Sequence, residues 1–247
     1  LMFSFKVNGQ ELGDLMIVNN IDFGFSPEVS STSRKYALVD GERFIRRRFG
    51  KRIIKVQFTI LGDRIEKSKI AIQRALLVPG ISKFEFGYQP DVYYEGAVSG
   101  TSDFNLITFR YAQGAFEIHC FNPFAISKTE KTAKRESNKL IFNNEGTIPV
   151  YPTYKFTAGR PYKMISFAHP SGKIVQYGYE NGEAVINTND LVVFDSAENK
   201  LTINGERKYI NAASQVFSIQ PGITEIAIIG DENKIPVVDA TFKERWI

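Results

Sequence analysis

The sequence is poor in the residues that most often build reactive centres. Its 247 residues include one cysteine, two histidines and one tryptophan. The single cysteine, Cys120, excludes an intramolecular disulfide and a zinc site made from several cysteines. A metal site at His119 or His169 would need carboxylate ligands, and the sequence shows no such spacing. We therefore expect neither a bound metal nor another cofactor.

Sequence motifs of catalysis are lacking as well. The chain has no P-loop, no dinucleotide-binding glycine motif, no nucleophile elbow and no zinc-protease motif. His119 and Cys120 are neighbours on a predicted strand, so their side chains point to opposite faces and cannot easily act on one substrate. Acidic pairs such as Asp91 and Glu95 fit a glycosidase in principle, but any β protein carries scattered acids. We expect a protein that is not an enzyme.

Long hydrophobic runs are missing too. No stretch approaches 18 apolar residues, the length needed for a membrane-spanning helix. The first residues also lack the basic start, the apolar centre and the small-residue cleavage site of a signal peptide. These features predict a soluble chain that is not secreted and has no membrane partner.

Aromatic and branched residues, by contrast, are plentiful. The chain has 20 Phe and 11 Tyr, and 43% of its residues are hydrophobic. Such side chains pack well on a pleated sheet, so the composition favours a mainly β protein. The length permits one large domain or two of medium size.

Strand patterns fill residues 2–128, which we expect to form a β-sandwich or barrel with one helix. Asn8-Gly9 predicts a hairpin turn. Residues 54–60 alternate apolar and polar side chains, which indicates a half-buried strand. The polar segment 28–35 is predicted to be a loop.

One helix is expected near residues 64–78. Asp63 is suited to cap it, and Glu66 three residues later would complete a capping box. Pro79-Gly80 would end the helix.

The apolar pattern lapses in a charged stretch after Asn122, and we place a linker at residues 129–138. A second antiparallel β-sandwich without a helix is predicted for residues 139–235. The last residues, 236–247, are apolar enough to dock back on the body.

The positive charge is concentrated in one place. The segment 43–55, "RFIRRRFGKRIIK", holds seven of the 31 Lys and Arg and none of the 27 Asp and Glu. Gly50 predicts a turn, so the basic residues would flank the tip of a hairpin. A protein that coats nucleic acid usually spreads its basic residues over a whole face, so this run indicates a local role. The candidate interface residues are Arg43, Arg46, Arg47, Arg48, Lys51 and Arg52.

Several segments, taken together, resemble the distal tail proteins of siphophages and prophages of Gram-positive bacteria. The most specific are "NNEGTIPVYPTY" at residues 143–154 and the Asn204-Gly205-Glu206 hairpin followed by Pro221-Gly222. The resemblance spans almost the whole chain. The other segments that carry it are "FKVNGQELGDLMIVNNIDFGF", "VDGERFIRRRFGKRIIKVQFTILGD", the predicted helix and "FEIHCFNPFAI".

The resemblance implies both a fold and a role. It implies an N-terminal domain related to tail-tube subunits, which forms a homo-hexameric ring, and a C-terminal galectin-like sandwich. The ring would be the hub of a baseplate at the tip of the virion tail, made in the cytoplasm of the bacterial host. It would join the tail tube protein to the tail-associated or tail-fibre protein and to the receptor-binding protein. DNA would be a partner only by passage through the central channel.

Two other functions stay open at this stage. A carbohydrate-binding module that contacts host cell-wall saccharide is the alternative implied by the galectin-like half, although the only Trp available to stack on a sugar is Trp246. A nucleic-acid binder is suggested by the basic segment 43–55. The simplest interpretation of that segment is a solvated hairpin, and with the resemblance we expect it to contact a neighbouring subunit.

Overall fold

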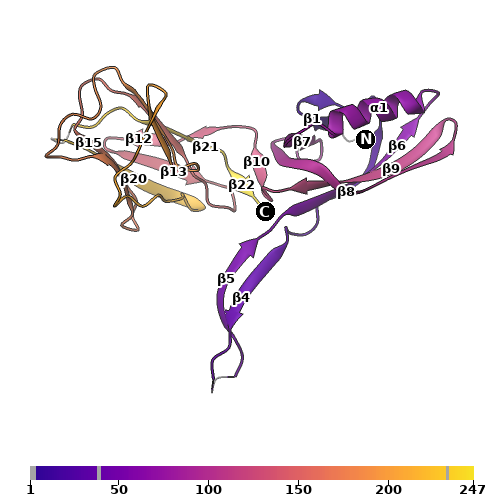
Figure 1. Ribbon diagram of the computed structural model, residues 1–247, viewed down its shortest axis with the longest axis horizontal. Coiled ribbons are helices and arrows are strands. Elements are labelled where there is room, and N and C mark those ends of the chain that lie inside the picture. Colours follow the sequence, from indigo (N-terminus) through magenta and orange to yellow (C-terminus); the bar gives the residue numbers. More distant parts are fainter. Residues whose placement is uncertain (1–3, 38–39, 232–233) are drawn as a thin grey trace. The chain divides into compact units, whose positions relative to one another are not determined.

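The computed structural model describes residues 4–37, 40–231 and 234–247. The described chain is mainly antiparallel β-structure with a single α-helix (Figure 1). It divides into two compact units, Leu1–Lys128 together with Ile247, and Thr129–Trp246. That helix is too short and too polar to cross a membrane. The predicted mainly β class with one helix is confirmed.

The first unit is built on one long antiparallel sheet. Its strands pair in the order β2-β1-β7-β8-β9-β6-β3, and β10 pairs with the start of β8. Strands β4 and β5 pair only with each other. The strands of this unit are β1 (Phe5–Val7), β2 (Gln10–Glu11), β3 (Ile17–Asp22), β4 (Val29–Arg34), β5 (Arg43–Phe49), β6 (Arg52–Leu61), β7 (Ser82–Phe86), β8 (Val92–Thr108), β9 (Tyr111–Cys120) and β10 (Ala125–Ser127).

Aromatic side chains fill the core of this unit. Phe5 on β1 lies 5.3 Å from Phe86 and 6.0 Å from Phe116, measured between ring centroids. Phe116 belongs to β9, which is separated from β1 by β7 and β8 in the sheet. The sheet is therefore curved, and β1 and β9 contribute to the same core. The alternation predicted for residues 54–60 is confirmed, with one exception. Thr59 is buried on the polar side because its hydroxyl accepts a hydrogen bond from Asn19 Nδ2 at 2.7 Å.

Helix α1 (Ile65–Leu76) lies in the predicted place and buries Ile65, Ile72 and Leu76. The predicted capping box is wrong. The helix begins after Arg64, and no side chain caps it. The Asp63 carboxylate instead binds Arg110, with 2.5 Å between Oδ1 and Nε, and this charge-assisted contact occupies the group that would have capped the helix.

The hairpin predicted at Asn8-Gly9 is confirmed. Val7 of β1 faces Gln10 of β2, and both turn residues have positive φ, 49° and 83°. The prediction of a loop at 28–35 is wrong, because residues 29–34 form β4. Neither face of β4 is buried, so this strand has no apolar alternation that a sequence could reveal.

The second unit consists of two antiparallel sheets, with the orders β11-β21-β14-β17-β18-β19 and β12-β13-β20-β15-β16. Tyr154 and Phe167, one from each sheet, stack with ring centroids 4.3 Å apart, so the sheets share one core. The strands are β11 (Lys131–Thr132), β12 (Lys134–Glu136), β13 (Lys139–Asn144), β14 (Thr153–Thr157), β15 (Met164–Ala168), β16 (Ile174–Gly178), β17 (Leu191–Asp195), β18 (Lys200–Ile203), β19 (Glu206–Lys208), β20 (Gly222–Gly230), β21 (Asp239–Phe242) and β22 (Arg245–Trp246).

The margins of this unit carry more structure than we expected. Within the segment 129–138, predicted as a linker, β11 pairs with β21 and β12 pairs with β13. Short polar strands at the edge of a sheet need little apolar sequence, which is why the pattern suggested a break. Near the C-terminus, β21 pairs with β14 inside the second unit. The galectin-like character of this unit stays a prediction.

Candidate functional site: an exposed basic hairpin

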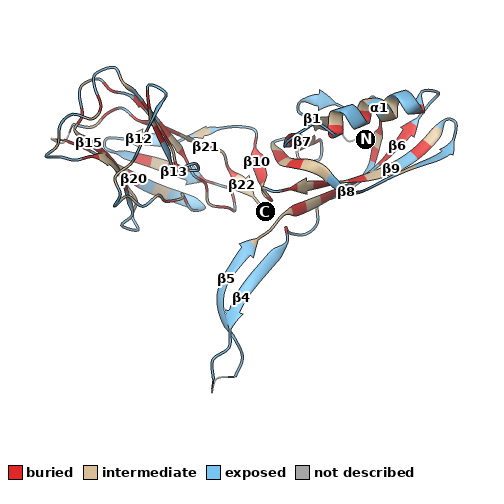
Figure 2. Cartoon of the chain, in the orientation of Figure 1, coloured by how far each residue is buried: buried red, intermediate tan, exposed pale blue. Residues whose placement is uncertain are grey.

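The basic segment lies on a hairpin that we call the arm, residues 28–51. Strands β4 and β5 form its two sides, with Ser30 facing Arg48 and Thr32 facing Arg46. A bulge between Thr32 and Ser33 shifts the register nearer the tip. Every residue of β4 and β5 is exposed except Phe49, and Figure 2 shows both strands almost entirely in pale blue.

Gly50 lies at the base of the arm and not at a hairpin tip, which corrects the prediction for this turn. Its backbone N–H donates to the Glu28 carbonyl at 2.7 Å, and the Glu28 N–H donates to the Lys51 carbonyl at 3.0 Å. The chain then continues into β6, which pairs with β3 and β9. β5 pairs with β4 because β6 already has a neighbour on each side.

The structure separates the six candidate residues into two groups. Arg43, Arg46, Arg47 and Arg48 are exposed on β5, whereas Lys51 is half-buried at the base. Arg47 lies over the ring of Phe49, with its guanidinium carbon 5.8 Å from the ring centroid. Among the described residues, none of these four arginines has a carboxylate within ion-pair distance.

Arg52 does not belong to this exposed surface. It is 4% exposed, and its guanidinium carbon lies 5.8 Å from the ring centroid of Tyr94. Its Nε and Nη2 atoms find no hydrogen-bond partner in the part of the chain that the structure describes. Burial also raises the pKa of the Tyr94 hydroxyl, so the two groups face each other as a cation and a neutral phenol.

The arm combines this charge with apolar side chains that sequence reasoning missed. Tyr36, Phe44 and Ile45 are all exposed, as is Val29. The arm holds seven Lys or Arg against three Asp or Glu. One of these acids, Glu42, is engaged locally, since it accepts from the Ser33 hydroxyl and lies 3.7 Å from Lys35 Nζ. Exposed arginines beside exposed aromatics are typical of protein interfaces.

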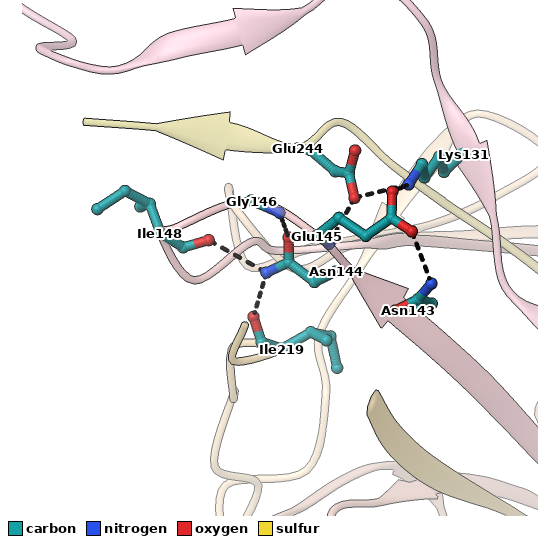
Figure 3. Close-up of polar contacts among 8 residues, drawn as sticks. All are labelled: Lys131, Asn143, Asn144, Glu145, Gly146, Ile148, Ile219 and Glu244. Atoms are coloured by element: carbon teal, nitrogen blue, oxygen red, sulfur yellow. Dashed lines mark hydrogen bonds and ion pairs between the residues drawn. The ribbon is translucent and has the colours of Figure 1, made fainter. Parts of the chain in front are cut away.

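A second polar cluster explains the segment "NNEG" at residues 143–146 (Figure 3). Asn144 is buried at the end of β13. Its side-chain amide donates to the carbonyls of Ile148, at 3.1 Å, and Ile219, at 3.4 Å, while its Oδ1 accepts from the Gly146 N–H at 3.1 Å. The side chain of Asn144 therefore stabilises the turn that follows β13 through hydrogen bonds to the backbone.

The same cluster fixes the C-terminal segment inside the second unit. The Glu244 carboxylate, 6% exposed, accepts from the Glu145 N–H at 2.6 Å and from Lys131 Nζ at 2.8 Å. Lys131 also binds the Glu145 carboxylate at 2.6 Å. The hydrogen bond to Glu145, followed by that to Glu244, raises the pKa of the Lys131 ammonium, and Lys131 lowers the pKa of Glu145. These contacts are structural and contain no open ligand position.

No cluster of His, Cys, Asp and Glu that could hold a metal occurs among the described residues. His119 lies 3.3 Å from the Glu117 carboxylate on the same strand. Cys120 is fully buried, and burial raises the pKa of its thiol to about 12. His169 lies in the turn between β15 and β16, where Nδ1 is 2.8 Å from the Ser171 hydroxyl.

The sequence of the second unit is similar to a class of phage tail components. Residues 145–246 match the family model described as siphovirus-type tail component, C-terminal domain. No curated protein matches the sequence.

Solved structures extend this similarity to the whole chain. The crystal structure of the Dit protein of phage SPP1, described as a paradigm of the hub adsorption apparatus in phages that infect Gram-positive bacteria, is 15% identical. The match covers 100% of both chains, with a TM-score of 0.83. The baseplate of phage P2 in its activated conformation with Ca is 6% identical, with a TM-score of 0.54 over 99% of this chain and 98% of that one.

These findings confirm the resemblance to siphophage distal tail proteins.

Proposed function

We propose that this protein is the distal tail protein of a phage baseplate and forms a hexameric ring around the DNA channel. The observation that carries the proposal is the fold match to the hub protein of phage SPP1, which covers 100% of each chain. In this role the ring joins the tail tube to the tail-tip and receptor-binding proteins at the end of the virion tail. The proposed role is structural.

Free strand edges in the first unit support ring formation. β3 ends the strand order of its sheet, and residues 98–108 of β8 have β9 as their only strand neighbour within the described ranges. Successive pairs are antiparallel from β3 through β6 and β9 to β8, so β3 and β8 run in opposite directions. A copy placed beside another can therefore continue the sheet with an antiparallel pair. Head-to-tail contacts of this kind close into a ring.

The arm supplies a second contact surface for the same assembly. Its unpaired arginines can form bidentate hydrogen bonds with carboxylates of a neighbouring subunit or tail protein. Such bonds are strong where the interface excludes water and weak where it does not. The exposed Phe44 and Ile45 beside them would provide the apolar area that excludes water.

Charge reversal on the arm tests this proposal. The purified protein, at increasing concentration, should form rings of six subunits visible by negative-stain electron microscopy and by mass photometry. The triple variant Arg46→Glu, Arg47→Glu, Arg48→Glu should assemble at least tenfold more weakly, because each interfacial charge pair contributes on the order of 1 kcal/mol or more. The matched control reverses Lys155, Lys200 and Arg207, which lie on strands of the second unit.

Assembly is measured as the concentration at which half of the subunits are in rings. Unchanged assembly of the arm variant would exclude the arm from the interface but leave the ring intact. Absence of rings at every concentration, together with absence of the protein from tail tips in labelled virions, would overturn the hub function itself.

A further inference from the structure

The first unit has a fully exposed phenylalanine and an unfilled apolar groove. Phe25 follows β3 and is 104% exposed, the highest value of any large hydrophobic residue in the described chain. The groove lies between α1 and the strands β6, β9 and β8, and we call it the α1–β8 groove. Its apolar lining comes from Phe58, Ile72, Leu76, Val98, Phe104 and Phe116.

The turn that presents Phe25 is held in place. The Asp22 carboxylate accepts a hydrogen bond from the Gly24 N–H at 2.8 Å, and Gly24 adopts a positive φ of 64°. On the inner side, the ring of Phe23 packs edge-on against Phe86, with centroids 5.0 Å apart. Phe25 is thus directed outward by a fixed turn, so little conformational entropy is lost when a partner covers it.

The α1–β8 groove is suited to receive an aromatic ring. It encloses a cavity of about 120 Å³ whose walls are mostly apolar side chains. The polar residues at its rim include the half-buried Lys69, whose Nζ lies 4.6 Å from the ring centroid of Phe104, and the exposed Asp103. Apolar surface of this kind gains free energy when it is removed from water.

The charges near the two features are complementary in part. Phe25 is flanked by the exposed acids Asp22 and Glu28. The helix that forms one wall of the groove exposes Lys67 and Arg74, and it carries Lys69 at 3.7 Å from its one acidic residue, the exposed Glu66. Acidic groups around the phenylalanine would therefore meet mainly basic groups along α1.

The sheet register places the end of β3, three residues before Phe25, at the height of the groove. One rung joins Asp22 on β3 to Lys55 on β6 and Glu117 on β9. On β8, the position opposite Glu117 falls in the bulge between Val98 and Ser102. Both of these residues line the groove. A closed ring repeats by rotation without a rise, so the end of β3 in one copy arrives beside the groove of the next copy.

From these observations we infer that Phe25 of one subunit inserts into the α1–β8 groove of the neighbouring subunit. This inference rests on the proposed ring, and the occupant it assigns to the groove is a second copy of this chain. It gives the interface an apolar anchor near the base of the basic arm. Buried aromatic anchors usually carry a large share of binding energy.

Cysteine cross-linking tests the contact directly, because the native Cys120 is fully buried. Two single variants, Phe25→Cys and Ser102→Cys, are purified separately, mixed under assembly conditions and oxidised mildly. A disulfide-linked heterodimer on a non-reducing gel is expected. The control mixture pairs Tyr209→Cys, which replaces another exposed aromatic residue, with Ser102→Cys and should give no heterodimer.

The variant Phe25→Ala gives a quantitative test. It should raise the concentration for half-assembly about tenfold or more, and Phe25→Leu should restore part of the loss because it keeps an apolar side chain. Rings that form without the cross-link, or equal assembly of Phe25→Ala and the native chain, would overturn the inference and leave the ring standing. If the native chain forms no ring even in virions, both proposals fail.

Discussion

Replacing Glu244 by alanine should destabilise the second unit by removing the acceptor that holds its C-terminal segment. The Glu244 side chain is 6% exposed, and one of its oxygens accepts from both the Glu145 N–H and Lys131 Nζ. These two donors come from other parts of the unit, the turn after β13 and strand β11. The variant leaves both donors without this acceptor.

The expected loss follows from the two contacts. A hydrogen bond to a charged group contributes about 1.5 to 3 kcal/mol, which applies to the part-buried bond from the Glu145 N–H to the Glu244 carboxylate. Lys131 keeps its 2.6 Å contact with the Glu145 carboxylate and is about one-third exposed, so its share is that of a surface ion pair, about 0 to 1 kcal/mol. Together the free energy of unfolding should fall by about 2 kcal/mol.

Urea unfolding measured by tryptophan fluorescence is a suitable assay. Trp246 is the only tryptophan and belongs to β22 in the second unit, two residues after the mutated position. A loss of 2 kcal/mol should lower the urea midpoint by about 1 M at an unchanged slope. The control is Glu225→Ala, whose carboxylate binds Lys139 at 2.7 Å while both side chains are about half exposed. It should cost less than about 1 kcal/mol.

Two results would refute this reasoning. One is a Glu244→Ala variant whose midpoint matches that of the native chain, which would mean that water satisfies the freed donors. The other is an equal loss in the Glu225→Ala control, which would mean that burial does not distinguish the two carboxylates.

Two further predictions concern titratable groups. Cys120 is fully buried and burial raises the pKa of its thiol to about 12, so iodoacetamide at pH 8 should alkylate it only after unfolding, and rapid labelling of the native chain by mass spectrometry would contradict this. Asp190 has its pKa lowered, first by the hydrogen bond from the Asn187 N–H and then by Asn204. Its stabilising effect is therefore present above the ordinary carboxyl pKa and is lost as the pH falls through the lowered value. Asp190→Asn should flatten the acid limb of the stability curve, and an unchanged limb in urea titrations from pH 2 to 6 would contradict the assignment.

Local pattern was informative wherever one face of an element is buried. The alternation over residues 54–60 predicted strand β6 because its apolar side chains fill the core while Lys55 and Gln57 face water. The turn at Asn204-Gly205 could be predicted for another reason, since both residues adopt positive φ, 52° and 83°, which few residue types tolerate.

Pattern failed where neither face is buried. Strand β4 has exposed residues along its whole length, so its sequence resembles a loop. The hairpin turn predicted at Gly50 was wrong, since β5 pairs with β4 and Gly50 lies at the base of the arm; strand pairing depends on residues far along the chain. The cap of α1 failed similarly, since Arg110 binds Asp63 from a distance of 47 positions in sequence.

Composition and short motifs thus indicated a mainly β protein with one helix, a basic segment and a resemblance to phage distal tail proteins, because these depend on neighbouring residues alone. The exposed arm, the isolation of Arg52 from the other arginines, and the shared height of the end of β3 and the α1–β8 groove arise from contacts between segments that are distant in sequence. Such contacts come from strand register and side-chain packing. Neither leaves a periodic signal in the chain, so only the folded structure reveals them.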